Sequence, residues 1–199
     1  MQPVLIVVPV NSVLSACARS GNADRAEEWL RRMEEAGVKR NLTTYNTAIN
    51  AFGRSRRLEN AEQLLQAMPG QGVIPDGLSF KTLVDAGASA GDPVRAERVL
   101  EWMVKGMRLG AVASNQRHSN SDCFFSSMRL VVQAWSDAQN ADRAAHWLSV
   151  AMAEGMRMPD TLVRQVVDAF AAAGNHSEAS RLLSLTQKAG SSSRRPWSS

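Results

Sequence analysis

The sequence predicts an all-α fold, an α-solenoid in which five helix-turn-helix repeats stack into a right-handed superhelix. Apolar residues recur at positions i, i+3, i+4 and i+7, as on one face of a helix, and these stripes come in pairs. The pairs also recur at a fixed spacing, because an alanine at the start of each second stripe returns after 35 residues, with one step of 48 residues. These alanines are Ala26, Ala61, Ala96, Ala144 and Ala179. A single pair has too little apolar surface to fold alone, so neighbouring pairs must stack.

The first pair of helices is expected on either side of a short turn. Gly21 can adopt the left-handed conformation that ends a helix, and Asn22 can cap the N–H groups of the helix that follows. The two stripes are Val10, Val13, Leu14 and Cys17, then Ala26, Trp29, Leu30 and Met33. We therefore expect one helix before Gly21 and one after it.

The second and third pairs repeat this arrangement. The second lies in the stretch 42–76, which ends in Gly72 and in Pro75, a residue that prevents continuation of a helix. In the third pair Asp92 and Pro93 predict a helix start, since aspartate caps and proline suits the first helical position. The stripes are Tyr45, Ala48, Ile49, Phe52, Ala61, Leu64, Leu65 and Met68, then Phe80, Leu83, Val84, Gly87, Ala96, Val99, Leu100 and Met103.

After three repeats over 7–110 the pattern is interrupted. Residues 111–122 are rich in Ser and Asn and have no apolar stripe, so we expect an exposed inserted loop. Two degenerate repeats then follow over 123–190, and the polar segment 191–199 is expected to be a disordered tail. The segment 1–6 is expected to be an N-terminal extension, truncated if the chain is part of a longer product.

Composition and motifs argue against several classes of protein. The apolar run at residues 4–10 is too short to span a bilayer and lacks the basic region of a signal peptide, so no membrane partner is expected. Gly87, Ser89 and Gly91 match G-x-S-x-G, but a helix rather than a strand precedes them. The histidines and the two cysteines have no metal-ligand spacing. We expect no enzyme activity, no metal and no cofactor, and a net charge of +4 permits a polyanionic partner.

One stretch carries a family resemblance. The period of 35, the sequence Thr44-Tyr45-Asn46-Thr47, and the residues Ala61, Met68, Gly72, Pro75 and Asp76 resemble the pentatricopeptide repeat, and the resemblance covers residues 7–190. It implies binding of single-stranded RNA, with successive repeats each addressing one base through two or three side chains. It also implies a role in RNA processing, stability or translation in a mitochondrion or a chloroplast, although no targeting peptide is visible.

The resemblance assigns roles to particular residues. Base reading falls to Asn11, Asn46, Lys81, Arg129 and Arg164, with Asn41 and Asp76 as partners of the first two. Residues that flank a base are Val8, Thr43 and Leu78, and phosphate contacts fall to Arg19 and Arg54. The pair of Asn46 and Asp76 resembles a uridine-preferring combination, whereas Lys81, Arg129 and Arg164 are hydrogen-bond donors only and depart from the family pattern.

An alternative is a solenoid of the tetratricopeptide type that binds other proteins. Its period is 34 residues, and its aromatic and glycine pattern is different. Salt dependence separates the two functions, because RNA binding weakens steeply with salt whereas a helix held in an apolar groove depends on apolar area. We expect a monomer that binds single-stranded RNA, with protein partners as the alternative.

Overall fold

The computed structural model describes residues 7–113, 117–154, 156 and 158–189. Over these residues it contains ten α-helices, one turn of 3-10 helix (η1) and no strand, which confirms the all-α prediction. The helices are α1 (Val7–Ser20), α2 (Ala23–Glu35), α3 (Leu42–Arg54), α4 (Leu58–Ala67), α5 (Gly77–Ser89), α6 (Pro93–Arg108), α7 (Arg117–Asp137), α8 (Ala141–Ala153), α9 (Asp160–Ala172) and α10 (His176–Ala189), and η1 spans Pro69–Gln71.

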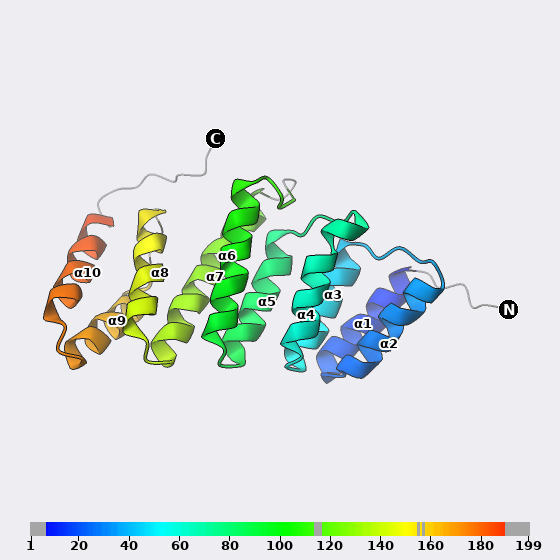
Figure 1. The fold of residues 1–199 in the computed structure, drawn as a ribbon, viewed down its shortest axis with the longest axis horizontal. Coiled ribbons are helices and arrows are strands. Elements are labelled where there is room, and N and C mark those ends of the chain that lie inside the picture. The colour runs from blue at the N-terminus through cyan, green and yellow to red at the C-terminus, as the bar shows by residue number, and fades with distance from the viewer. Residues whose placement is uncertain (1–6, 114–116, 155, 157, 190–199) are drawn as a thin grey trace.

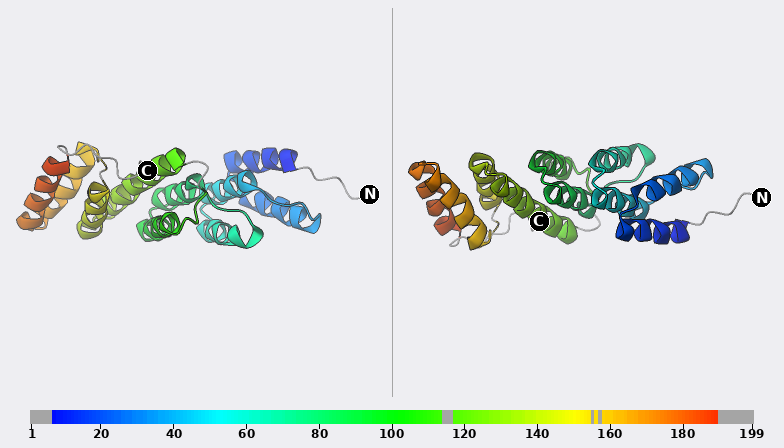
Figure 2. Two further views of the ribbon diagram at one scale, coloured as in Figure 1. Left: turned by 90° about the horizontal axis from the view of Figure 1, so that it is seen from above. Right: turned by 90° about the horizontal axis from the view of Figure 1, so that it is seen from below.

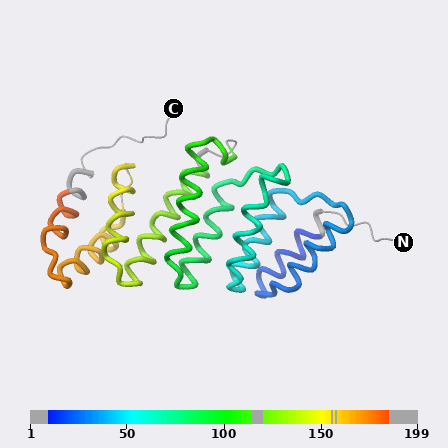
Figure 3. Tube along the Cα trace, viewed as in Figure 1, coloured from blue at the N-terminus to red at the C-terminus, as the bar shows by residue number. Residues whose placement is uncertain are grey.

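The helices form an elongated stack in chain order, from α1 and α2 at one end to α9 and α10 at the other (Figure 1). Each odd-numbered helix packs against the next even-numbered helix and also against the next odd-numbered helix. Two layers result, seen edge-on in Figure 2, and the Cα trace in Figure 3 follows the chain from one pair to the next. We call the odd-numbered helices the inner layer and the even-numbered helices the outer layer.

Polar side chains begin most of the helices, as the sequence predicted for two of them. Asn22 accepts a hydrogen bond from Arg25 N at 3.0 Å, and Asp92 accepts one from Arg95 N at 3.0 Å. These bonds satisfy N–H groups that have no partner within the helix. Gly21 ends α1 with φ of 65°, a left-handed conformation that glycine adopts without strain.

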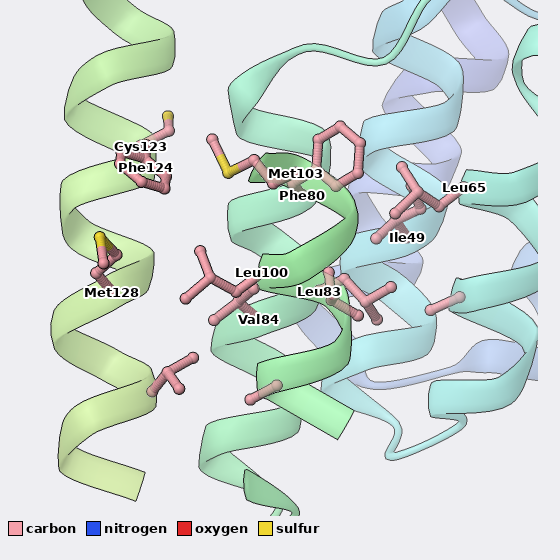
Figure 4. Close-up of a cluster of buried hydrophobic side chains, with 14 of the residues drawn as sticks. Ile49, Leu65, Phe80, Leu83, Val84, Leu100, Met103, Cys123, Phe124 and Met128 are labelled. Atoms are coloured by element: carbon pink, nitrogen blue, oxygen red, sulfur yellow. The ribbon is translucent and has the colours of Figure 1, made fainter. Parts of the chain in front are cut away.

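The predicted stripes form the core between the layers. Leu83 and Val84 of α5 and Leu100 of α6 are fully buried. Figure 4 shows Val84 and Leu100 on the side of Met128 of α7, and Leu83 on the side of Ile49 of α3 and Leu65 of α4. Neighbouring pairs of helices therefore share one continuous apolar core, as expected for a solenoid.

The predicted loop over 111–122 is wrong in part, because α7 begins at Arg117. Asn120 is only 5% exposed, and its Oδ1 accepts from Gly77 N at 2.7 Å while its Nδ2 donates to Ala113 O at 2.7 Å. These contacts compensate for the weak helix propensity of Ser and Asn. The insertion thus lengthens α7 and packs it against the start of α5.

Other boundary predictions fall outside the described part of the chain, namely the segment 1–6 and the tail 191–199. No helix among the described residues has both the length and the apolar character needed to cross a membrane.

Candidate nucleic-acid interface

A groove of about 740 Å³ lies on the inner layer. Its lining comes from α1, α3 and α5, together with Asp76 just before α5. The lining residues are Ser15, Ala18, Arg19, Leu42, Thr43, Asn46, Thr47, Asn50, Gly53, Arg54, Asp76, Leu78, Thr82, Asp85, Ala86 and Ser89. The lining combines polar and apolar groups, and it runs across three successive repeats.

Asn46 and Asp76, predicted to act as a pair, meet in this groove. Asn46 Nδ2 donates to Asp76 Oδ1 at 3.3 Å. Asp76 also caps α5, because its Oδ1 accepts from Ser79 N at 2.9 Å. The cap fixes the carboxylate, and the carboxylate in turn holds one edge of the Asn46 amide. One N–H and one lone pair of that amide are left for a ligand in the groove.

The first repeat has a related arrangement with an amide in place of the carboxylate. Asn41 caps α3 by accepting from Thr44 N at 2.9 Å. The hydroxyl of Thr44 lies 2.8 Å from Asn11 Oδ1 and 2.9 Å from Asn41 Oδ1. The structure thus brings Asn11 and Asn41 to one hydroxyl group rather than into a direct hydrogen bond with each other.

Two predicted phosphate contacts, Arg19 and Arg54, line the groove near the ends of α1 and α3. Both are exposed, and over the described residues neither forms an ion pair. By contrast, Arg57, at the start of α4, forms ion pairs with Asp24 and Glu27 of α2. Arg19 and Arg54 are therefore the cations of the groove whose charge is not neutralised by a neighbouring carboxylate.

The predicted flanking residues Thr43 and Leu78 also line the groove, and Leu78 is 48% exposed. Leu78, one residue beyond the start of α5, therefore adds an exposed apolar surface to the groove. Val8 lies in α1, but its side chain is outside the part of the chain that the structure describes.

The other predicted reading residues lie outside the groove lining. Lys81 Nζ forms an ion pair with Asp85 Oδ2 at 2.6 Å, one turn further along α5. Arg129 on α7 and Arg164 on α9 are exposed, beyond the three helices that line the groove. The structure therefore groups Asn46 and Asp76 with Arg19 and Arg54 in the groove lining. Asn11 and Asn41 lie outside that lining, as these three cations do.

Sequence reasoning missed Thr44 and Ser79. Both are fully buried, and each hydrogen-bonds to a predicted reading residue of the preceding repeat. A signal was present, since the two are 35 residues apart and both carry a hydroxyl group. The described residues contain no group of three His, Cys, Asp or Glu side chains that could hold a metal ion.

A family model, described as the pentacotripeptide-repeat region of PRORP, matches residues 8–116. No curated protein matches the chain in sequence.

Solved structures share the fold. The pentatricopeptide repeat protein PPR10 from maize aligns with a TM-score of 0.71 at 23% identity, over 93% of this chain and 25% of that one. Its complex with an 18-nt psaJ RNA element aligns with a TM-score of 0.61 at 22% identity, over 94% and 26% of the two chains. The PPR domain of Arabidopsis thaliana protein-only RNase P 1, in complex with tRNA, aligns with a TM-score of 0.67 at 12% identity, over 95% and 93%. The chain thus spans about a quarter of the maize protein.

Proposed function

Because the chain belongs to the pentatricopeptide-repeat family, we propose that its inner groove binds single-stranded RNA and discriminates between bases. The observation that carries the proposal is the hydrogen-bonded pair of Asn46 and Asp76 in a groove that also presents Arg19 and Arg54. Such a groove offers both kinds of contact that RNA recognition uses, fixed polar groups for a base edge and free cations for the backbone. The complexes of the two similar proteins with RNA support this proposal.

Base discrimination is assigned to the amides. An amide both donates and accepts, so it can form two hydrogen bonds along the Watson–Crick edge of a pyrimidine. Asp76 accepts from Asn46 and thereby orients this amide. We propose that Asn46 with Asp76 reads one base, preferably uridine, and that Asn11 with Asn41 reads a neighbouring pyrimidine, while Thr43 and Leu78 flank the bases.

The cations are assigned to the phosphate backbone. Arg19 and Arg54 line the groove, and phosphate contacts contribute affinity without sequence information. We propose that Arg129 and Arg164 extend this attraction along α7 and α9, and that Lys81 contributes less because Asp85 already pairs with it. The three repeats over 7–110 then form the reading part of the protein, and the two degenerate repeats over 123–190 prolong the cationic surface.

In the cell, we propose that the protein supports RNA processing, stability or translation in a mitochondrion or a chloroplast, with any cleavage of the bound RNA performed by a partner. Microscopy of the protein tagged at its C-terminus and expressed from its own gene tests the compartment. A uniform cytosolic signal would contradict the proposed location in a mitochondrion or a chloroplast.

The binding proposal is tested with two variants and a matched control. Asn46→Ala should lower the ratio of oligo-U to oligo-A affinity, because it removes the reading amide. Arg54→Ala should weaken both RNAs equally and lower the slope of log affinity against log salt by about 0.7, the single-strand value for one phosphate contact. Arg31→Ala is the control, since Arg31 lies on the exposed side of α2 and pairs with Glu28 at 2.7 Å.

Fluorescence anisotropy over a salt series measures all four proteins with both RNAs. We expect the control to match the wild type within error. If the protein binds neither RNA at low salt, or if Asn46→Ala leaves the affinity ratio unchanged, the base-reading proposal fails. A solenoid that binds proteins then becomes the better hypothesis.

A further inference from the structure

Two hydroxyl groups occupy equivalent places behind the reading amides. Ser79 Oγ lies 2.6 Å from Asn46 Oδ1, and Thr44 Oγ1 lies 2.8 Å from Asn11 Oδ1. Both side chains have no exposed surface, and both belong to the first turn of the helix in the following repeat. The same contact therefore occurs twice, one repeat apart.

We infer that Thr44 and Ser79 are positioning residues that set base preference by fixing the orientation of the Asn11 and Asn46 amides. This inference rests on the proposed function, because it assigns a role to the reading amides. It adds two residues that contact the amides from behind and have no surface for RNA to touch.

The direction of each hydrogen bond follows from the caps. The backbone N–H of Asp76 donates to Ser79 Oγ at 3.2 Å, and that of Asn41 donates to Thr44 Oγ1 at 3.4 Å. Each hydroxyl therefore already accepts one hydrogen bond, and its single proton is shared between the oxygen of the reading amide and the capping oxygen of Asp76 or Asn41. The reading amide consequently turns its oxygen toward the hydroxyl.

The two repeats differ in how strongly the amide is held. Both polar atoms of the Asn46 amide are held: Oδ1 by the Ser79 hydroxyl and Nδ2 by the Asp76 carboxylate. An ionised carboxylate only accepts hydrogen bonds, so it selects the NH₂ group of the amide. For Asn11, no described side chain other than Thr44 forms a hydrogen bond with the amide. Loss of the hydroxyl should therefore free the Asn11 amide to rotate by about 180°, whereas Asp76 should still orient Asn46.

A rotated amide exchanges its donor and its acceptor. The hydrogen-bond donors and acceptors of each base have fixed positions on its Watson–Crick edge. An amide held in one orientation therefore favours the base whose pattern it matches, and an amide that adopts two orientations discriminates less between bases. Total affinity depends mainly on phosphate contacts and should change little. The predicted signature is a loss of preference without an equal loss of binding.

The experiment compares Thr44→Val, Thr44→Ser, Ser79→Ala and Asn11→Ala with the wild type, using labelled oligo-U, oligo-C and oligo-A at one salt concentration. Thr44→Val should lower the largest affinity ratio among the three RNAs by about threefold to tenfold, the range for one net hydrogen bond. Thr44→Ser should restore the ratio, because it restores the hydroxyl. Ser79→Ala should lower the ratio less than Thr44→Val does.

Thermal melts of each variant accompany the titrations, since Thr44 and Ser79 also belong to helix caps. If Thr44→Val weakens all RNAs equally and keeps the ratios, the hydroxyl is only structural and the inference is overturned. The same holds if Asn11→Ala changes the ratios and Thr44→Val does not. If neither Asn11→Ala nor Thr44→Val changes them, base reading by Asn11 fails and this inference fails with it.

Discussion

The absence of one methyl group at Gly77 allows α5 and α7 to meet. A Cβ atom there would lie 2.7 Å from the Cα and 2.7 Å from the Oδ1 of Asn120. We expect Gly77→Ala to reduce the free energy of unfolding by about 1–3 kcal/mol, the usual cost of overpacking. Urea denaturation of this variant measures the loss. Gly70→Ala is the control, because a Cβ at Gly70 meets nothing within 4 Å, and equal stability of the two variants would contradict the close contact.

Leu100 on α6 gives a second prediction for a single side chain. It has no exposed surface and lies between α5 and α7 (Figure 4). Leu100→Ala should lower the free energy of unfolding by about 2–5 kcal/mol, through lost burial and the cavity that remains. Leu109→Ala, at a side chain that is 71% exposed, should cost far less in the same denaturant melts. A loss below about 1 kcal/mol for Leu100→Ala would show that α6 does not pack as described.

The residues of the site were predictable only where the family resemblance assigns a role to a repeat position. The resemblance implied the pair of Asn46 and Asp76, and the structure places them within hydrogen-bonding distance. It did not predict Ser79, because serine three residues after a capping aspartate is explained equally well as part of the cap. Only the packing of α3 beside α5 shows that its hydroxyl also reaches the preceding repeat.

Helix boundaries were predictable where a local signal decides them. Asp92 and Pro93 begin α6 as predicted, because the cap and the fixed proline φ act within one turn. The start of α7 was not predictable, since the residues 117–122 have low helix propensity. Asn120 is held there by hydrogen bonds to Gly77 and Ala113, which lie 43 and 7 residues away in the chain. Tertiary contacts of this kind override local propensity.

The start of α6 gives a prediction for pH. Burial raises the pKa of Asp92, but hydrogen bonds from the backbone and guanidinium of Arg95 outweigh it and hold the pKa below 3.8. Folding therefore favours the carboxylate, whose contribution is present above pH 3.8 and is lost as the pH falls through the lower folded pKa. Asp92→Asn keeps the capping acceptor and removes the charge.

Denaturant melts of wild type and Asp92→Asn across pH values measure this contribution. We expect the wild type to be the more stable at neutral pH and the difference to shrink as the pH is lowered below 3.8. A difference that stays constant down to about pH 2 would show that the charge of Asp92 is not its source.

For the whole molecule, the proposed function predicts that bound RNA extends along the stack beyond the groove. The groove ends at α5, whereas Arg129 and Arg164 lie on the next two inner helices. The double variant Arg129→Ala/Arg164→Ala should lower the salt slope by about 1.4, twice the single-strand value, and leave the oligo-U to oligo-A ratio unchanged. Anisotropy titrations over a salt series measure both quantities. An unchanged slope would show that bound RNA ends at the groove.

The hydrogen bonds around Asn46 have a consequence for engineering. The amide belongs to α3, whereas Asp76 and Ser79 lie at the start of α5, so this set of three hydrogen-bonded side chains is shared by two consecutive repeats. A transferred segment that spans one sequence repeat, 42–76, would contain Asn46 and Asp76 but not Ser79. A segment that spans 46–79 would contain all three residues. Modular redesign of such arrays should therefore cut inside the inner helices rather than at the turns between repeats.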